Sequence, residues 1–184
     1  MKKNILIIII SVIISVLGIG FFVYTLSVPD QIIDEKSVSA KEKEVSKTKD
    51  IKNVTYQEIV LEKADGRKVN LADYKNQPKM LLFFNKENQD SMEVLKKVEE
   101  MYINYEEIQF FMINTATEVD ETLAEEYSLE IYYDFNQEAA KSYKVKDVPS
   151  AIYIDELRNF LNAKTGYTTT DALEANLDIL SNNI

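Results

Sequence analysis

Hydrophobic residues are grouped in short runs along most of the chain, and the spacing within the runs changes from strand-like to helical. Residues 79–84 (KMLLFF) and 107–114 (EIQFFMIN) are nearly continuous apolar runs, as expected of strands buried on both faces of a sheet. Between them, apolar residues recur at helical spacing from Met92 to Tyr105, which predicts a helix of about 15 residues. Asp90, three positions before Glu93, is typical of a helix start, and we expect it to cap this helix.

The same patterns predict the remaining elements of the outer part of the chain. Residues 56–62 and 68–74, joined at Asp65-Gly66, predict a β-hairpin because this dipeptide tolerates positive φ. The other expected elements are helices over 120–127 and 137–143, a strand over 130–134, an antiparallel pair over 148–155 and 158–167, and a final helix that carries Leu173, Leu177 and Leu180. Alternating strands and helices predict an α/β fold with a mixed sheet covered by helices on both faces.

Residues 5–28 carry no charge, and as a helix they would extend about 36 Å, enough to cross a hydrocarbon core of about 30 Å. A cleaved signal peptide has a shorter apolar run and a small-residue cleavage site, so we expect an uncleaved single transmembrane helix, with a removed signal as the alternative. Lys2 and Lys3 precede the run and Asp30 follows it. The positive-inside rule therefore predicts a cytoplasmic N-terminus over 1–4 and an extracytoplasmic C-terminal domain at the cell membrane.

Residues 29–55 contain six acidic residues, six lysines and no aromatic residue. Such a segment buries too little apolar surface to offset its ordering entropy, so we expect a charged flexible linker. A short helix over 39–50 is the alternative, since alternating Lys and Glu permit one. The linker would leave residues 56–184 as the outer domain, with 25 acidic and 13 basic residues.

Composition excludes several chemistries. The chain has no Cys and no His, so it has no disulfide, thiolate nucleophile, imidazole ligand or Ser-His-Asp triad. A net charge of −10 argues against nucleic acid as a partner. Only four glycines are present, without a phosphate-binding loop, and we expect neither a metal nor a cofactor. One acidic cluster lacks the spacing of a calcium loop and is interpreted as a solvated helix face: Glu118, Asp120, Glu121, Glu125 and Glu126.

Three segments together resemble a known family: 71–85 (LADYKNQPKMLLFFN), 110–114 (FFMIN) and 132–155 (YYDFNQEAAKSYKVKDVPSAIYID). They are similar to extracytoplasmic, membrane-anchored thioredoxin-like proteins, the thiol–disulfide reductases of the cytochrome c maturation type. The resemblance covers about residues 58–182. It implies a thioredoxin-like mixed sheet, here preceded by the N-terminal hairpin and the transmembrane helix.

The family's redox motif, Cys-x-x-Cys at the start of the first central helix, is degenerate in this chain. The resemblance places Asn88, Gln89, Asp90 and Ser91 at the four motif positions. Thiol–disulfide exchange needs a thiolate, which neither an amide nor a serine hydroxyl replaces. We therefore expect no catalytic residue and no enzymatic thiol–disulfide activity.

The family's cis-proline corresponds to Pro149, and the resemblance implies that Val148, Pro149 and Ser150 border a peptide groove. Strand addition needs backbone groups and no thiol, so such a groove can persist without redox chemistry. We expect an accessory module that binds a protein or peptide outside the cell membrane. Two alternatives remain open: a non-catalytic or regulatory component of thiol–disulfide exchange or cytochrome c maturation, and a structural envelope protein.

Overall fold

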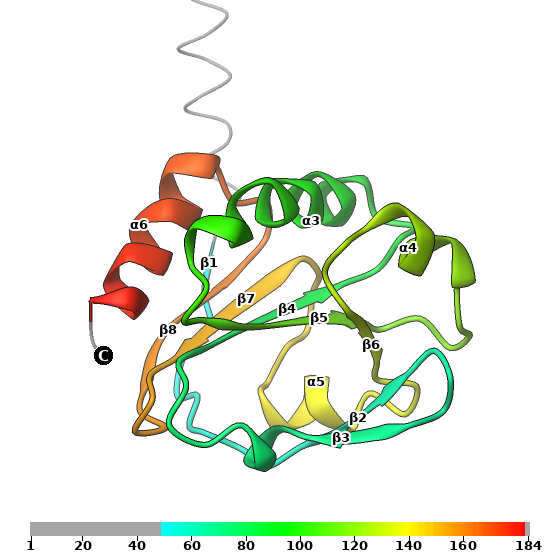
Figure 1. Cartoon of the computed structure of the whole chain (residues 1–184), viewed down its shortest axis with the longest axis horizontal. Coiled ribbons are helices and arrows are strands. Elements are labelled where there is room, and N and C mark those ends of the chain that lie inside the picture. The colour runs from blue at the N-terminus through cyan, green and yellow to red at the C-terminus, as the bar shows by residue number, and fades with distance from the viewer. Residues whose placement is uncertain (1–48, 183–184) are drawn as a thin grey trace, which may run out of the picture. The chain divides into compact units, whose positions relative to one another are not determined.

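A computed structural model of the protein describes residues 49–182, which contain an eight-stranded sheet with helices on both faces (Figure 1). The strand order is β1-β8-β7-β4-β5-β6-β2-β3. The strands are β1 (Lys49–Asp50), β2 (Val60–Lys63), β3 (Lys68–Asn70), β4 (Lys79–Phe84), β5 (Gln109–Asn114), β6 (Ile131–Tyr133), β7 (Ser150–Ile154) and β8 (Phe160–Thr165).

Strand β4 lies at the centre of this sheet, where it pairs in parallel with β5 and antiparallel with β7. All six of its residues are buried, which explains why its sequence is a continuous apolar run after Lys79. Strand β6 continues the parallel part beside β5, whereas β8 pairs antiparallel with β7. The predicted mixed sheet is confirmed.

The helices form two layers, with α3 (Gln89–Met101) and α6 (Thr170–Ser181) on one face of the sheet and α5 (Glu138–Ser142) on the other (Figure 1). The short α4 (Glu121–Glu126) contributes Leu123 to the core on the α3 side. Alternate β4 residues divide between the two cores, with Met80, Leu82 and Phe84 on the α3 face and Leu81 and Phe83 on the α5 face. This division follows from the two-residue period of a strand.

The predicted N-terminal hairpin is present but shorter than expected. β2 and β3 pair antiparallel from Val60 opposite Asn70, and Gly66 has a φ of 83° in the turn. After β3 the chain forms a 3-10 turn over Leu71–Asp73, because the Asn70 side chain accepts a hydrogen bond from the Ala72 N–H at 2.9 Å. β2 also pairs with β6, so the hairpin extends the main sheet.

The predicted boundary between linker and domain at residue 55 is wrong. Lys49–Asp50 forms β1, which pairs with β8 from Lys49 opposite Thr165. Val54 is 7% exposed and belongs to the core on the α5 face, against which Ile51 also packs. These two apolar side chains attach the end of the predicted linker to the folded domain.

The predicted segments 1–4 and 5–28, and the linker up to residue 48, lie outside the described residues. None of the helices that the structure describes is long and apolar enough to span a membrane. The alternative of a helix over 39–50 is replaced at Lys49–Asp50 by a strand, and its remainder also falls outside the described residues.

A fully buried lysine is an unusual feature of the central sheet. Lys79, the first residue of β4, has no exposed surface, and its ammonium donates a hydrogen bond to the Gln77 carbonyl oxygen at 2.6 Å. Burial, together with the positive charge of Arg158, lowers the pKa of Lys79 to about 8, although Asp155 partly opposes this shift. The charged form is therefore disfavoured in the folded state.

We expect Lys79→Met to increase stability at pH 7 and to change its pH dependence. Between the folded pKa of about 8 and the ordinary value of 10.5, only the unfolded state holds the proton, so the free energy of unfolding of the parent rises with pH. In Lys79→Met, this rise of the free energy of unfolding with pH should be absent. Urea titrations from pH 7 to 10 measure the difference, with exposed Lys96→Met as control. Equal pH profiles for Lys79→Met and the parent would contradict the depressed pKa.

Candidate functional site

The loop that carries the degenerate motif and the loop that carries Pro149 meet at one end of the central strands β4 and β7. The antiparallel register places Phe83 of β4 opposite Ser150 of β7, so the end of β4 and the start of β7 lie side by side. The chain leaves β4 through residues 85–88 into α3 and enters β7 through Val148 and Pro149. The Val148–Pro149 peptide bond is cis, as the resemblance implied.

Asn88 caps helix α3. Its side-chain oxygen accepts a hydrogen bond from the Ser91 N–H at 2.8 Å, and its carbonyl oxygen accepts one from the Met92 N–H at 3.2 Å. The prediction that Asp90 is the cap is therefore wrong. Asp90 instead occupies the first helical turn, where a carboxylate interacts favourably with the helix dipole. An amide at the first motif position thus has a structural role in forming the helix.

Ser91, at the last motif position, has no exposed surface, and its hydroxyl has no hydrogen-bond partner within residues 49–182. Its backbone N–H is already bound to Asn88. A buried hydroxyl without a neighbouring base lacks both the access and the activation that a nucleophile needs. Ser91 therefore lacks the environment of the nucleophile of a serine hydrolase.

The three predicted groove residues differ in what they offer a partner. Pro149 and Ser150 are buried; the Pro149 carbonyl accepts from the Gly166 N–H at 2.7 Å, and the Ser150 hydroxyl donates to the Asp147 carbonyl at 2.6 Å. Val148 is half-buried, and its backbone N–H and carbonyl make no hydrogen bond in the described part of the chain. Val148 is therefore the residue at which an added strand could pair.

A polar cleft of about 430 Å³ adjoins the motif at the carboxyl ends of β4 and β5. Lys86 forms an ion pair across it with Asp120, whose side chain also caps α4 through the Thr122 N–H at 3.0 Å. The hydrogen bond from Lys86, supported by Thr122, lowers the pKa of Asp120 to about 2. The cleft is lined by Asn85, Lys86, Glu87, Thr115, Ala116, Thr117, Glu118, Val119, Asp120 and Gln137.

This geometry corrects one interpretation of the acidic cluster at 118–126. Asp120 is 9% exposed and acts as a structural cap and ion-pair partner, so it does not belong to a solvated face. Sequence spacing could not show the Lys86–Asp120 pair, because the two residues come from separate loops. Within residues 49–182, no group of three acidic side chains has the arrangement of a metal site.

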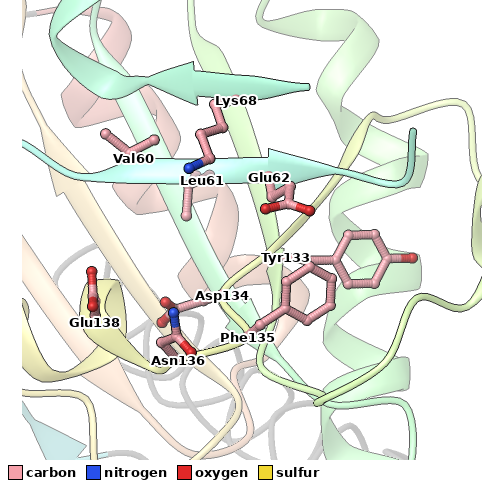
Figure 2. A pocket seen from close by; sticks show the side chains of 9 residues that line it. All are labelled: Val60, Leu61, Glu62, Lys68, Tyr133, Asp134, Phe135, Asn136 and Glu138. Carbon is pink, nitrogen blue, oxygen red and sulfur yellow. The ribbon is translucent and has the colours of Figure 1, made fainter. Parts of the chain in front are cut away.

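A second, smaller cleft of about 140 Å³ lies between the β2–β3 hairpin and the turn that follows β6 (Figure 2). Figure 2 shows Glu62, Lys68 and Asp134 among the side chains around it. Asp134 is committed to structure, since its two carboxylate oxygens accept from the Ala139 and Ala140 N–H groups at 3.1 and 2.8 Å. The Asp134 carboxylate is therefore not free to bind a ligand in this cleft.

Solved structures with the same fold were found, although no protein-family model and no curated protein matches the sequence. The pneumococcal exposed lipoprotein thioredoxin (Etrx1) of Streptococcus pneumoniae is 18% identical with a TM-score of 0.57, covering 67% of this chain and 100% of its own. A DsbF homologue from Corynebacterium diphtheriae is 17% identical with a TM-score of 0.60, covering 73% and 93%. A secreted Mycobacterium tuberculosis disulfide oxidoreductase is 14% identical with a TM-score of 0.58, covering 66% and 96%.

The fold is thioredoxin-like. Its structural neighbours include thiol–disulfide oxidoreductases, and the expected mixed α/β architecture is confirmed. At identities of 18% and 17%, these similarities establish the fold and not the function. The function has to be inferred from the residues of this chain. Those residues include no cysteine at any position.

Single alanine substitutions at the two outer motif positions should have opposite effects on stability. Asn88→Ala removes the cap of α3 and should cost about 0.5–2 kcal/mol of unfolding free energy. Ser91→Ala removes a buried, unpaired hydroxyl and should be neutral or stabilising by up to about 1 kcal/mol. Denaturant titration of both variants measures the contrast. If Ser91→Ala is the more destabilising variant, the assignment of Ser91 as an unpaired buried group is wrong.

Proposed function

We propose that the protein is a membrane-anchored, extracytoplasmic binding module in which a thioredoxin-like domain holds an extended segment of another protein without redox chemistry. The binding edge consists of Val148 and the residues that surround the start of α3, Asn88–Ser91. The observation that carries the proposal is that the backbone N–H and carbonyl of Val148 have no hydrogen-bond partner within residues 49–182.

Strand addition explains how this edge would bind. An extended peptide beside Val148 would accept a hydrogen bond from its N–H and donate one to its carbonyl oxygen. Both groups are left without partners by the described fold, although the neighbouring Pro149 and Ser150 are fully engaged. Affinity would come from these backbone bonds, and selectivity from the side chains around them.

The absence of thiols separates this proposal from the activity of the structural neighbours. Without a cysteine, the chain has no group that can attack a disulfide or form a mixed disulfide. The names of those neighbours favour one second candidate, a non-catalytic or regulatory component of thiol–disulfide exchange. Its extension to cytochrome c maturation rests on the sequence resemblance alone. Both candidates predict binding at the same edge and differ in the identity of the partner.

The anchor and its orientation are proposed from the sequence. The uncharged run 5–28 is long enough to span a bilayer, and lysines precede it. Two of the structural neighbours are an exposed lipoprotein and a secreted protein, which supports an extracytoplasmic location. The linker would then hold the binding edge near the membrane surface.

A photoreactive amino acid at Val148 should crosslink to a discrete partner in intact membranes, because this residue borders the proposed binding edge. The matched control is Leu157, which is 73% exposed in the turn after β7, at the opposite end of that strand. Mass spectrometry of the crosslinked product identifies the partner.

Binding measured with purified components tests whether the crosslink reflects the proposed binding edge. The purified partner should bind the full-length protein in detergent micelles, and this binding should protect the Val148 amide from hydrogen exchange. Crosslinking of the same partner from Leu157 with equal efficiency, or no protection at Val148, would contradict the binding edge. A thiol–disulfide oxidoreductase as partner would favour the second candidate.

Protease added to wall-free cells should digest residues 56–184 and leave a membrane-embedded fragment containing 5–28. The physical reason is the charge asymmetry around the uncharged run, which orients the domain away from the cytoplasm. Immunoblotting with N-terminal and C-terminal tags follows both products. Full protection of the domain would contradict the orientation, and release of the whole domain into the medium would indicate a cleaved signal.

A further inference from the structure

A basic cleft of about 330 Å³ adjoins the proposed binding edge and is not part of it. It forms where β1 and the segment that follows it meet the loop between α5 and β7. Its lining residues are Lys49, Asp50, Ile51, Lys52, Lys144, Lys146, Asp147 and Thr165. We call this group the lysine cleft.

The lysine cleft reverses the charge of the domain around it. Residues 49–182 carry 26 acidic and 15 basic side chains, whereas the cleft gathers four lysines and two aspartates. One of those aspartates, Asp50, is already paired with Lys164 from β8. The local potential is therefore positive in an otherwise negative domain.

The ammonium groups of this cleft are largely uncompensated. Lys49, Lys52 and Lys146 are exposed and make no ion pair within the described part of the chain. Lys144 donates to the Asn53 carbonyl oxygen at 2.5 Å, which orients its ammonium without neutralising it. Lysines that neither pair with a carboxylate nor cover a core are available to an anionic ligand.

The cleft is continuous with the Val148 edge. Asp147, one of its lining residues, directly precedes Val148, and its carbonyl oxygen accepts hydrogen bonds from Ser150 and Thr165 at 2.6 and 3.1 Å. Thr165 also lines the cleft, and its hydroxyl oxygen lies 2.8 Å from that of Ser150. A chain paired with Val148 would therefore pass directly beside the lysines.

We infer that the lysine cleft selects the partner of this domain, and that the partner is an extended protein segment carrying carboxylate side chains. The inference rests on the proposed function, since the segment would pair with the Val148 backbone. Alternate side chains of an added strand point the same way, so acidic residues at every second position would face the cleft together. The negative remainder of the domain would repel the same segment elsewhere.

The concave shape of the lysine cleft and its position beside Val148 favour a peptide over an anionic membrane surface as its ligand. A bilayer presents a flat array of head groups, whereas the lysines line a cleft next to two unpaired backbone groups. Only a polypeptide offers both carboxylates and a complementary backbone. Binding to anionic lipid is kept as an outcome of the test.

The test uses the full-length protein in neutral detergent micelles and three extended peptides of one length, with Glu, Gln or Lys at alternate positions. Nuclear magnetic resonance titration follows the Val148 and Lys146 amides. We expect the Glu peptide to bind at least about fivefold more tightly than the Gln peptide, because several exposed ion pairs of modest strength add together. The Lys peptide should not bind. Near 1 M salt the preference should disappear, because the Debye length falls to about 3 Å.

Charge reversal locates the interaction. Lys52→Glu combined with Lys146→Glu should lower affinity for the Glu peptide about fivefold or more, since neither lysine has a structural partner in the described chain. The matched control is Lys75→Glu combined with Lys96→Glu, two exposed lysines outside the cleft with the same change in net charge. This control should bind the Glu peptide nearly as the parent does.

The outcomes separate this inference from the proposed function. Equal binding of the Glu and Gln peptides at Val148 would overturn the lysine cleft and leave the binding edge intact. Binding of the Glu peptide at the lysines, with no change at Val148, would overturn both. Binding of the parent to phosphatidylglycerol vesicles but to no peptide, with loss of binding in Lys52→Glu/Lys146→Glu, would assign the cleft to lipid and overturn the inference.

Discussion

The antiparallel pairing of β4 with β7 is the constraint on which the candidate site depends. It brings the end of a fully buried strand to the start of another, so the loop into α3 and the loop that contains Pro149 emerge side by side at one end of these central strands. Burial of β4 on both faces fixes this register, because a slip of one residue would exchange the side chains of the two cores. The site is therefore held by the most buried part of the fold.

The absence of cysteine limits the chemistry at this end of the sheet and leaves its backbone geometry intact. The cap of α3 is supplied by Asn88, and Ser91, which the sequence resemblance places at the last motif position, is buried without a hydrogen-bond partner in the described chain. The start of α3 is therefore structurally complete without a thiol. What persists is backbone geometry, which depends on strand pairing and not on side-chain reactivity.

Electrostatics adds a second level of organisation. An excess of acidic residues is spread over the described domain, but lysines from β1 and from the loop after α5 converge beside Asp147 and Thr165. The first of these lysines lie in the part of the chain whose polar composition predicted a linker. Ile51 and Val54, near the end of that part, pack into the core and attach it to the domain. Ile51 also lines the cleft.

The sequence by itself determined the order of the strands and helices from residue 56 onward, the two-sided burial of β4 and β5, the hairpin turn at Gly66 and the absence of thiol chemistry. Each of these depends on local periodicity or on the presence of a residue type. Only the tertiary structure decided that β1 joins β8, that Asn88 caps α3, and that Lys86 meets Asp120. The pairing of β1 with β8 and the Lys86–Asp120 contact join residues distant in the chain, and the Asn88 cap depends on side-chain orientation. Hydrophobic periodicity predicts neither contacts between distant residues nor the orientation of a single side chain.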